Sequence, residues 1–377
     1  MSGVCAVICE FDPLHAGHKK VIDLAKSTSD VVIAVLSGNF TQRSLPAAFD
    51  KYTRARAAVA CGVDLVVELP FPWSSSGVEF YAFGGVTTAL LLGADSFCFG
   101  SECGSVDTLS NAVDYSRTSE YISSVETLAR DPEVGAAKAI DEAFRKGGFE
   151  IGKNDKLAVE YLKTVMNSGR DGVTFKTVRR DNRIAPASDI RKIIAESGLT
   201  PAEGLIVPDA YKVYSSGSSV VSSRDRFDLI SFLFFRFFCG NDPEEFFEAS
   251  GGLGRRLLKA AASSPSHREF FRSASTKKYT DSRIRRAALY SVLGVKKSDL
   301  TEPPSFTYLL AANEKGRNYL SGLKDAEIAV ITKPSDGVTD ICNRQIELEI
   351  RADELYSLCC EPPAPYGRFL RSSPFVE

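Results

Sequence analysis

The sequence predicts an α/β fold, with a Rossmann-like parallel sheet in the first part of the chain and a mainly helical C-terminal part. Three observations predict it. The first hundred residues alternate between apolar, β-branched runs and helical segments. The chain has 377 residues, which is too long for one ordinary core. Beyond a stretch rich in serine and glycine at 213–226, the pattern becomes mostly helical.

The alternation predicts βαβ units, whose parallel sheet is covered by helices on both faces and whose crossovers are right-handed. Each apolar run that ends in turn residues is expected to form a strand, and each segment with helical apolar spacing a helix. In chain order the expected elements are a strand at 3–11, a helix at 16–27, a strand at 30–40, a helix at 50–62, a strand at 63–71, a helix at 77–93 and a strand at 94–102.

Helical patterns dominate the rest of the chain. Residues 105–150 are helical and charged, an amphipathic helix is expected at 154–169, and a last strand and helix of the first domain are expected around 173–198. We therefore predict three regions: a first domain at 1–200, a linker region at 201–226 and a C-terminal domain at 227–377. Within the last region the sequence predicts helices over 227–323 and a strand over 326–333.

Composition favours a soluble globular protein, with 44% hydrophobic and 25% charged residues. The most apolar segment, "LISFLFFRFFCG" at 229–240, is short and contains Arg236, so we expect a buried helix rather than a membrane span. No basic and apolar leader precedes the first strand, so no secretory signal is expected. The nine cysteines follow no paired metal or disulfide spacing. A reducing cytoplasm and no resident metal site are therefore predicted.

Charge is unevenly distributed along the chain. Residues 251–300 hold twelve Lys or Arg against three acidic residues, an excess of nine, although the whole chain carries a net charge of −2. Such asymmetry points to a polyanionic partner for the basic segment, and a solvated helical face is an equal alternative from charge alone.

The first turn of the predicted sheet, "EFDPLHAGHKK", contains two of the three histidines in the chain, His15 and His18. In an open parallel sheet, ligands bind outside the carboxyl ends of the strands. The amide groups and dipole at a helix start attract phosphate there, and imidazoles can stabilise charge that develops on it. Gly17 allows a nucleotide to approach the backbone closely. The alternative is that both histidines only cap the helix.

Other polar or small-residue loops fall at the same end of the sheet. They are "SGNFTQR" at 37–43, "ELPFPWSSSG" at 68–77 and "FGSE" at 99–102, which contains Gly100. Further along, the helix start "PASDIRK" offers Ser188 and Arg191 to the outer phosphates, and Arg179 and Arg180 lie just before it. Each signal alone is weak, but together they predict a phosphate-binding site.

These residues resemble a known family. The H-x-G-H after the first strand and the helix start after the last one are similar to the HIGH-motif nucleotidyltransferase superfamily. The resemblance narrows to the tRNA(Met) cytidine acetate ligases through "FDPLHAGH", "VVIAVLSGNFTQR", "PAAFDKYTRARAA", "GVDLVVELPF", "LGADSFCFGSE", "NDKLAVEYLK", "TVRR", "KKYTDSRIRRAALYSVLG" and "AVITKPSD". These segments follow one another from residue 4 to beyond 330.

The resemblance implies an enzyme that activates acetate with ATP, forming acetyl-adenylate and releasing pyrophosphate. It would then acetylate N4 of the wobble cytidine of elongator tRNA(Met). Mg²⁺ is expected to arrive with ATP, because no dedicated carboxylate cage is visible. The expected partners are therefore this tRNA, acetate and ATP, and no membrane.

His15 and His18 are the predicted catalytic residues. The predicted ATP-binding residues are Val7, Ile8, Cys9, Glu10, Phe11, Asp12, Pro13, Leu14, His15, Gly17, His18, Gly100, Asn154, Arg179, Arg180, Ser188 and Arg191. The predicted tRNA contacts are Lys277, Lys278, Arg283, Arg285 and Arg286, which would position RNA through its phosphates. If the target base leaves its stack, Trp73 and the phenylalanines near it are candidate platforms.

Two alternatives remain at this point. The first is another nucleotidyltransferase, of the coenzyme or CDP-alcohol type, which would need no RNA surface; the basic segment argues against it. The second is an inactive nucleotide- or RNA-binding protein, against which the intact H-x-G-H argues. The sequence does not specify an oligomeric state.

Overall fold

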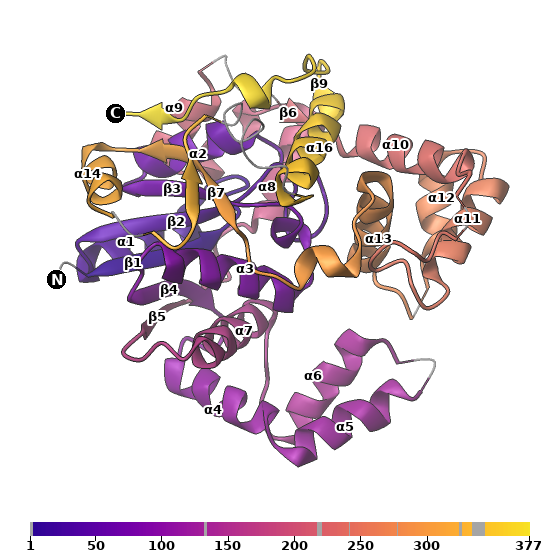
Figure 1. Cartoon of the computed structure of the whole chain (residues 1–377), viewed down its shortest axis with the longest axis horizontal. Coiled ribbons are helices and arrows are strands. Elements are labelled where there is room, and N and C mark those ends of the chain that lie inside the picture. Colours follow the sequence, from indigo (N-terminus) through magenta and orange to yellow (C-terminus); the bar gives the residue numbers. More distant parts are fainter. Residues whose placement is uncertain are drawn as a thin grey trace.

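Figure 1 shows the computed structural model of the chain, in which helices surround a central sheet. The structure describes residues 3–131, 134–216, 221–240, 242–276, 278–323, 326–333 and 344–377. Eight strands of these residues form one sheet, in the order β10, β7, β3, β2, β1, β4, β5, with β8 beside β7.

The first five strands form the parallel part of the sheet, as the alternation predicts. They are β1 (Val4–Cys9), β2 (Val31–Ser37), β3 (Leu65–Leu69), β4 (Ser96–Ser101) and β5 (Thr174–Arg179). Strand β2 is buried along its whole length, which explains why its sequence is a continuous apolar run rather than an alternating one. All five carboxyl ends point to one edge of the sheet, so the loops that follow them are brought together.

Helices cover both faces of this sheet. They are α1 (Ala16–Thr28), α2 (Lys51–Ala60), α3 (Val78–Leu91), α7 (Lys153–Ser168) and α8 (Ala187–Ser197), and their positions agree with the sequence prediction within a few residues. The helices α3 and α7 pack against each other on one face. Two buried apolar clusters lie on the two sides of the sheet, one beneath α3 and α7 and the other beneath α1, α2 and α8.

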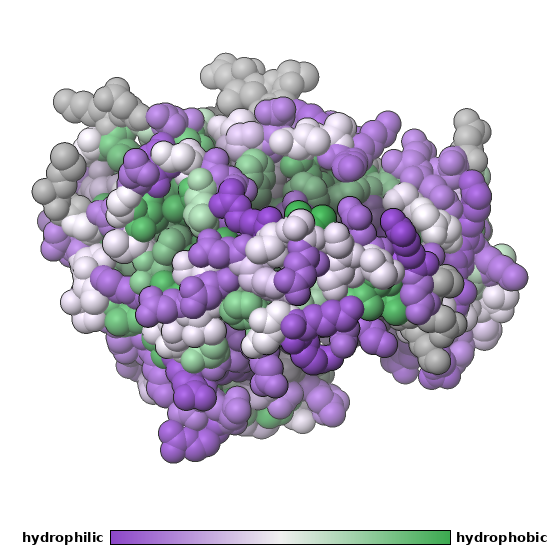
Figure 2. Space-filling view, turned by 90° about the horizontal axis from the view of Figure 1, so that it is seen from below, coloured by the Kyte–Doolittle hydropathy of each residue, from purple (hydrophilic) through white to green (hydrophobic). Residues whose placement is uncertain are grey.

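Three further helices project from the sheet edge at β5. They are α4 (Val106–Ser116), α5 (Ser119–Ala129) and α6 (Ala136–Lys146). Helices α5 and α6 form an antiparallel hairpin, which lies at the bottom of the view in Figure 1. Figure 2 views the molecule from this side, where polar side chains cover most of the face and apolar ones gather in its hollows. The turn of the hairpin reaches the C-terminal region, because Gly135 lies against the carbonyl oxygen of Lys278.

The C-terminal part begins as a helical unit with its own apolar core. The short helix α9 (Pro208–Tyr214) precedes it, and α10 (Arg224–Arg236), α11 (Leu253–Ser263), α12 (His267–Ala274) and α13 (Asp281–Leu293) form it. The apolar segment at 229–240 is only partly the buried helix that we expected. Phe232 and Phe235 enter the core, but Phe237 is 73% exposed, because the helix ends before it.

The prediction of helices throughout 227–323 is wrong at β7 (Phe306–Ala312). This strand pairs antiparallel with β3 and is fully buried. The chain then forms α14 (Glu314–Gly322), β8 (Ala329–Ile331), α16 (Arg344–Cys359) and β10 (Phe375–Val376), and both β8 and β10 pair with β7. Two short strands, β6 (Val221–Ser222) and β9 (Cys360–Glu361), pair separately. The last part of the chain therefore completes the sheet of the first, and the boundaries at 200 and 227 remain a prediction.

Candidate functional site

A single cleft lies at the carboxyl ends of β1, β4 and β5. It has a volume of about 2050 Å³ and extends from the first turn to α13, with α3, α6 and α7 along its walls. The described residues that line it include twelve Lys or Arg and six Asp or Glu. This cleft is therefore large enough for more than one ligand and favours anionic ones.

The two histidines lie at the start of α1 in this cleft. His15 is the N-cap residue, and its Nδ1 accepts a hydrogen bond from the Gly17 amide at 3.0 Å. The Nδ1 of His18 accepts from the His15 amide at 3.4 Å, and the two rings stack with their centroids 3.9 Å apart. Because each Nδ1 is an acceptor, each neutral ring carries its proton on Nε2 and can donate from that nitrogen.

Both histidines are held neutral at physiological pH. Burial lowers the pKa of His15 to about 4, with a further contribution from the positive charges of Arg180 and Arg191. Burial, followed by the neighbouring His15 and the same arginines, lowers the pKa of His18 well below its ordinary value. The pair can therefore donate hydrogen bonds to growing negative charge without first releasing a proton.

Arginines approach the histidines from the helix start after β5. Arg191 on α8 donates to the backbone oxygen of Asp12 and lies 3.6 Å from its carboxylate. Arg180 follows β5, is 44% exposed, and has its guanidinium 3.9 Å from the carboxylate of Glu102. Both line the cleft, which places two guanidinium groups where the outer phosphates of a nucleotide would lie.

A cap on α7 forms the adjoining wall. The side-chain amide of Asn154 donates to Glu102 at 2.9 Å, and its backbone amide donates to the same carboxylate. Asp155 is buried and accepts from the amides of Glu102, Cys103 and Gly152. Asp155 therefore has a structural role in joining α7 to the end of β4, and Asn154 faces the cleft beside it.

The turn between β1 and α1 is supported from behind by residues that sequence analysis did not select. Phe11 has a left-handed backbone, with φ at 45°, which costs energy for a residue with a side chain. The buried hydroxyl of Tyr214 accepts from the Leu14 amide at 3.2 Å and donates to the Phe11 carbonyl at 3.3 Å. The Val207 amide donates to the Leu14 carbonyl. Part of the predicted linker thus holds the turn in place.

Arg54 supports the same turn from α2. It is fully buried, and its guanidinium donates to the carbonyl oxygens of Phe49, Glu10 and Gly38. The last two follow β1 and β2, so Arg54 joins the ends of neighbouring strands. The "RAR" of the sequence gave no signal for this role, because its partners are backbone groups that are distant along the chain.

Comparison with known proteins identifies the family. A family model described as "HIGH Nucleotidyl Transferase" matches residues 2–367. The tRNA(Met) cytidine acetate ligases of Thermoanaerobacter pseudethanolicus and Lysinibacillus sphaericus are both 31% identical to this chain. The first alignment covers 94% of this chain and 95% of the relative, and the second covers 94% of each. The chain belongs to the tRNA(Met) cytidine acetate ligase family.

A solved structure of this family is also similar. The crystal structure of Thermotoga maritima TmcAL bound with alpha-thio ATP has a TM-score of 0.88 and 27% sequence identity, and the match covers 99% of each chain. The α/β fold predicted from the sequence is confirmed by this similarity.

Most of the residues predicted to bind ATP in this family member line the cleft. They are Val7, Ile8, Cys9, Glu10, Phe11, His15, Gly17, His18, Gly100, Asn154, Arg179, Arg180, Ser188 and Arg191. Asp12, Pro13 and Leu14 are instead buried behind the turn. The carboxylate of Asp12 accepts from the Ala48 amide at 2.8 Å, so this residue holds the turn rather than facing a ligand.

The residues predicted to contact tRNA differ in their exposure and in their partners. Lys278 is exposed, whereas Lys277 lies outside the described residues. Arg283 and Arg286 form ion pairs with Glu248 at the cleft wall. Arg285 lines the cleft but is only 4% exposed and is bound by Asp228 and Asp281, so its contact with tRNA stays a prediction. Its charge is used to join α13 to α10.

The aromatic prediction also needs a correction. Trp73 is fully buried and is not available to stack on a base. Phe80 and Phe83, on the following helix, do line the cleft. Sequence reasoning missed the difference because Trp73 precedes α3 and is covered by that helix, at Gly84, only through tertiary packing.

Neither a metal cluster nor a membrane helix is present in the part of the chain that the structure describes. No group of three or more His, Cys, Asp or Glu residues there is placed to bind a metal ion. No described helix is both long and apolar enough to cross a membrane.

Proposed function

We propose that this chain is an ATP-dependent ligase that joins acetate to N4 of the wobble cytidine of elongator tRNA(Met), giving N4-acetylcytidine. The observation that carries the proposal is one continuous, cation-rich cleft that holds both the neutral histidine pair and the face of α13. The family supports this activity, since its relatives are named for acetate and tRNA(Met) and one was solved with an ATP analogue.

In the first step, a carboxylate oxygen of acetate attacks the α-phosphorus of ATP. The new oxygen–phosphorus bond forms as the bond to pyrophosphate breaks, and acetyl-adenylate remains. Acetate is a weak nucleophile, so positioning and charge stabilisation matter more than a general base. His15 and His18 would donate from Nε2 to the phosphate oxygens, and Arg180 and Arg191 would neutralise the leaving pyrophosphate.

In the second step, N4 of the cytidine attacks the acyl carbon. The carbon–nitrogen bond forms, the bond to AMP breaks, and N4 loses one proton. Exposed cations of the 251–300 segment, such as Lys259 and Lys278, would hold the RNA backbone without reading its sequence. A cytoplasmic location fits a substrate of this kind.

Mg²⁺ would be carried to the cleft by the phosphates of ATP, because the described protein residues offer no cage of their own. The ion would neutralise charge on the outer phosphates when bound. The chain's own contribution is the pair of imidazole donors and the two arginines.

The decisive experiment incubates the protein with ATP, labelled acetate and tRNA(Met). Label on the RNA together with pyrophosphate release is expected. Pyrophosphate release only with another acid or an alcohol would replace this proposal with another nucleotidyltransferase activity. ATP binding without any turnover would identify an inactive binder.

A further inference from the structure

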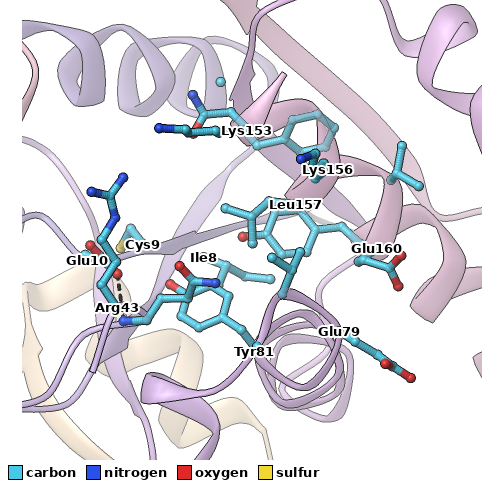
Figure 3. A pocket seen from close by; sticks show the side chains of 18 of the residues that line it. Ile8, Cys9, Glu10, Arg43, Glu79, Tyr81, Lys153, Lys156, Leu157 and Glu160 are labelled. Carbon is cyan, nitrogen blue, oxygen red and sulfur yellow. Dashed lines mark hydrogen bonds between the residues drawn. The ribbon is translucent and has the colours of Figure 1, made fainter. Parts of the chain in front are cut away.

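The wall of the cleft formed by α3 and α7 contains acidic groups that the adenylation step does not use. Glu79 and Glu160 line the cleft, and Figure 3 places both on one side of Tyr81 and Leu157, with Glu10 and Arg43 on the other. Glu160 is bound by Lys163 at 2.8 Å. No hydrogen bond or ion pair to the side chain of Glu79 is found among the described residues. An unpaired carboxylate thus lies in a cleft that otherwise favours anions.

Glu79 is exposed, and apolar and aromatic side chains of α3 and α7 line the same cleft. Glu79 and Phe83 are four residues apart on α3 and therefore share one face of the helix. Phe80 also lines the cleft and makes a perpendicular ring contact with Phe247, at 5.7 Å between ring centroids. Leu157 faces the cleft from α7, which packs on α3. A flat apolar ring with a hydrogen-bond donor at its edge fits this combination.

We propose that this α3–α7 wall binds the target cytosine, with the Glu79 carboxylate accepting a hydrogen bond from the exocyclic N4 amine. The inference rests on the proposed function and identifies the base subsite within it. A carboxylate accepts from the amine of cytosine but faces the O4 carbonyl of uracil, to which it cannot donate. The wall would therefore select an amine-bearing pyrimidine, while the cations of the rim hold the phosphates.

The test separates activation of acetate from transfer. Acetate-dependent exchange of labelled pyrophosphate into ATP reports the first step, and labelled acetate on tRNA(Met) transcripts reports the second. Glu79→Ala should leave the exchange unchanged and lower the kcat/KM of transfer about tenfold or more. Glu79→Gln keeps an acceptor oxygen and should recover most of the transfer. The control is Glu126→Ala, which removes an exposed acid on α5 that does not line the cleft.

Competition by a transcript with uridine at the wobble position supplies an independent readout. The wild type should bind the cytidine transcript more tightly, and Glu79→Ala should remove most of this difference. Unchanged transfer in Glu79→Ala, or an equal fall in exchange and transfer, would overturn the inference. A glutamine variant as poor as the alanine variant would also overturn it, because the charge at the α3 N-terminus would then be what matters. If the wild type shows no acetate-dependent exchange, the proposed function fails, and the competition still tests the base subsite.

Discussion

At the scale of single residues, the neutral tautomer of the histidine pair is the property on which the chemistry depends. Two backbone amides use the Nδ1 atoms as acceptors, which leaves Nε2 as the protonated nitrogen of each ring. A third histidine, His267, lies on α12 and is bound to Asp225 at 3.0 Å, outside the lining of the cleft. The chain therefore provides its own control for histidine substitutions.

Replacing His18 with alanine should lower acetate-dependent pyrophosphate exchange by about 100-fold or more, because one donor to the α-phosphate is lost. Binding of tRNA(Met), measured by filter retention, should stay close to that of the wild type. His267→Ala should change neither quantity. Loss of RNA binding before loss of exchange in His18→Ala would contradict the assigned role.

The depressed histidine pKa values also predict a pH dependence of stability. Since the pKa of His15 is about 4 in the folded chain, the unfolded chain takes up a proton first as the pH falls below 6.5. The free energy of unfolding should fall by about 1.4 kcal/mol per pH unit between pH 6.5 and 4 because of His15, and His18, whose pKa is also lowered, should add to the fall. Urea unfolding at a series of pH values, for the wild type and for a variant with both His15→Gln and His18→Gln, checks this pH dependence. If the free energies of unfolding of the two proteins changed in parallel with pH, the prediction would be refuted.

At the scale of elements, the histidine turn is a composite of several segments. It lies between β1 and α1, but its backbone is held by Tyr214 from α9 and by Arg54 from α2. The ring of Tyr214 stacks on Phe49 with centroids 4.3 Å apart, which fixes the hydroxyl independently of its hydrogen bonds. Tyr214→Phe would keep this stacking and remove only the hydroxyl.

We expect Tyr214→Phe to lower the kcat of pyrophosphate exchange about 10- to 100-fold, because a small displacement of the turn misplaces the histidines in the transition state. The KM for acetate should change much less. Tyr211→Phe, on the same helix, is the matched control and should be neutral. If Tyr214→Phe and Tyr211→Phe changed the kcat of pyrophosphate exchange equally, the Tyr214 hydroxyl would not position the turn.

The outcome of the sequence predictions follows from the range of the interactions involved. His15, His18 and the parallel strands could be predicted, because strand, turn and helix start are adjacent in the sequence. The strand β7 could not, since its partner β3 lies more than 200 residues earlier and its apolar run also fits a helix. The burial of Trp73 and Arg285 could not be predicted either, because residue type indicates chemistry, whereas burial depends on tertiary packing.

At the scale of the whole molecule, a buried charge cluster joins the two ends of the chain. The ammonium group of Lys51, at the start of α2, contacts Glu68 at 2.9 Å, Glu349 at 3.0 Å and Asp353 at 2.8 Å. Glu349 and Asp353 belong to α16, and the Asp353 carboxylate also accepts from Asn39. Burial raises the pKa of Asp353 to about 7, against the opposing charge of Lys51.

Lys51→Met should lower the free energy of unfolding by about 3–5 kcal/mol, because three buried carboxylates lose their only direct cation among the described residues. Lys212→Met, which removes an exposed ion pair with Asp209, should cost less than about 1 kcal/mol. Denaturant titration followed by circular dichroism measures both. A loss in Lys51→Met no larger than that of the control would show that the cluster does not stabilise the junction.

The position of β7 in the sheet has a consequence for how the chain folds while it is synthesised on the ribosome. Until residues 306–312 have been synthesised, the backbone of β3 has no partner on the side away from β2. Glu349 comes later still, so Lys51 cannot yet pair with it. An emerging chain that ends between residues 214 and 306 therefore carries the histidine turn with its supporting Tyr214 on an unfinished sheet with an open, apolar edge. Nascent chains stalled before and after this strand should differ sharply in protease resistance.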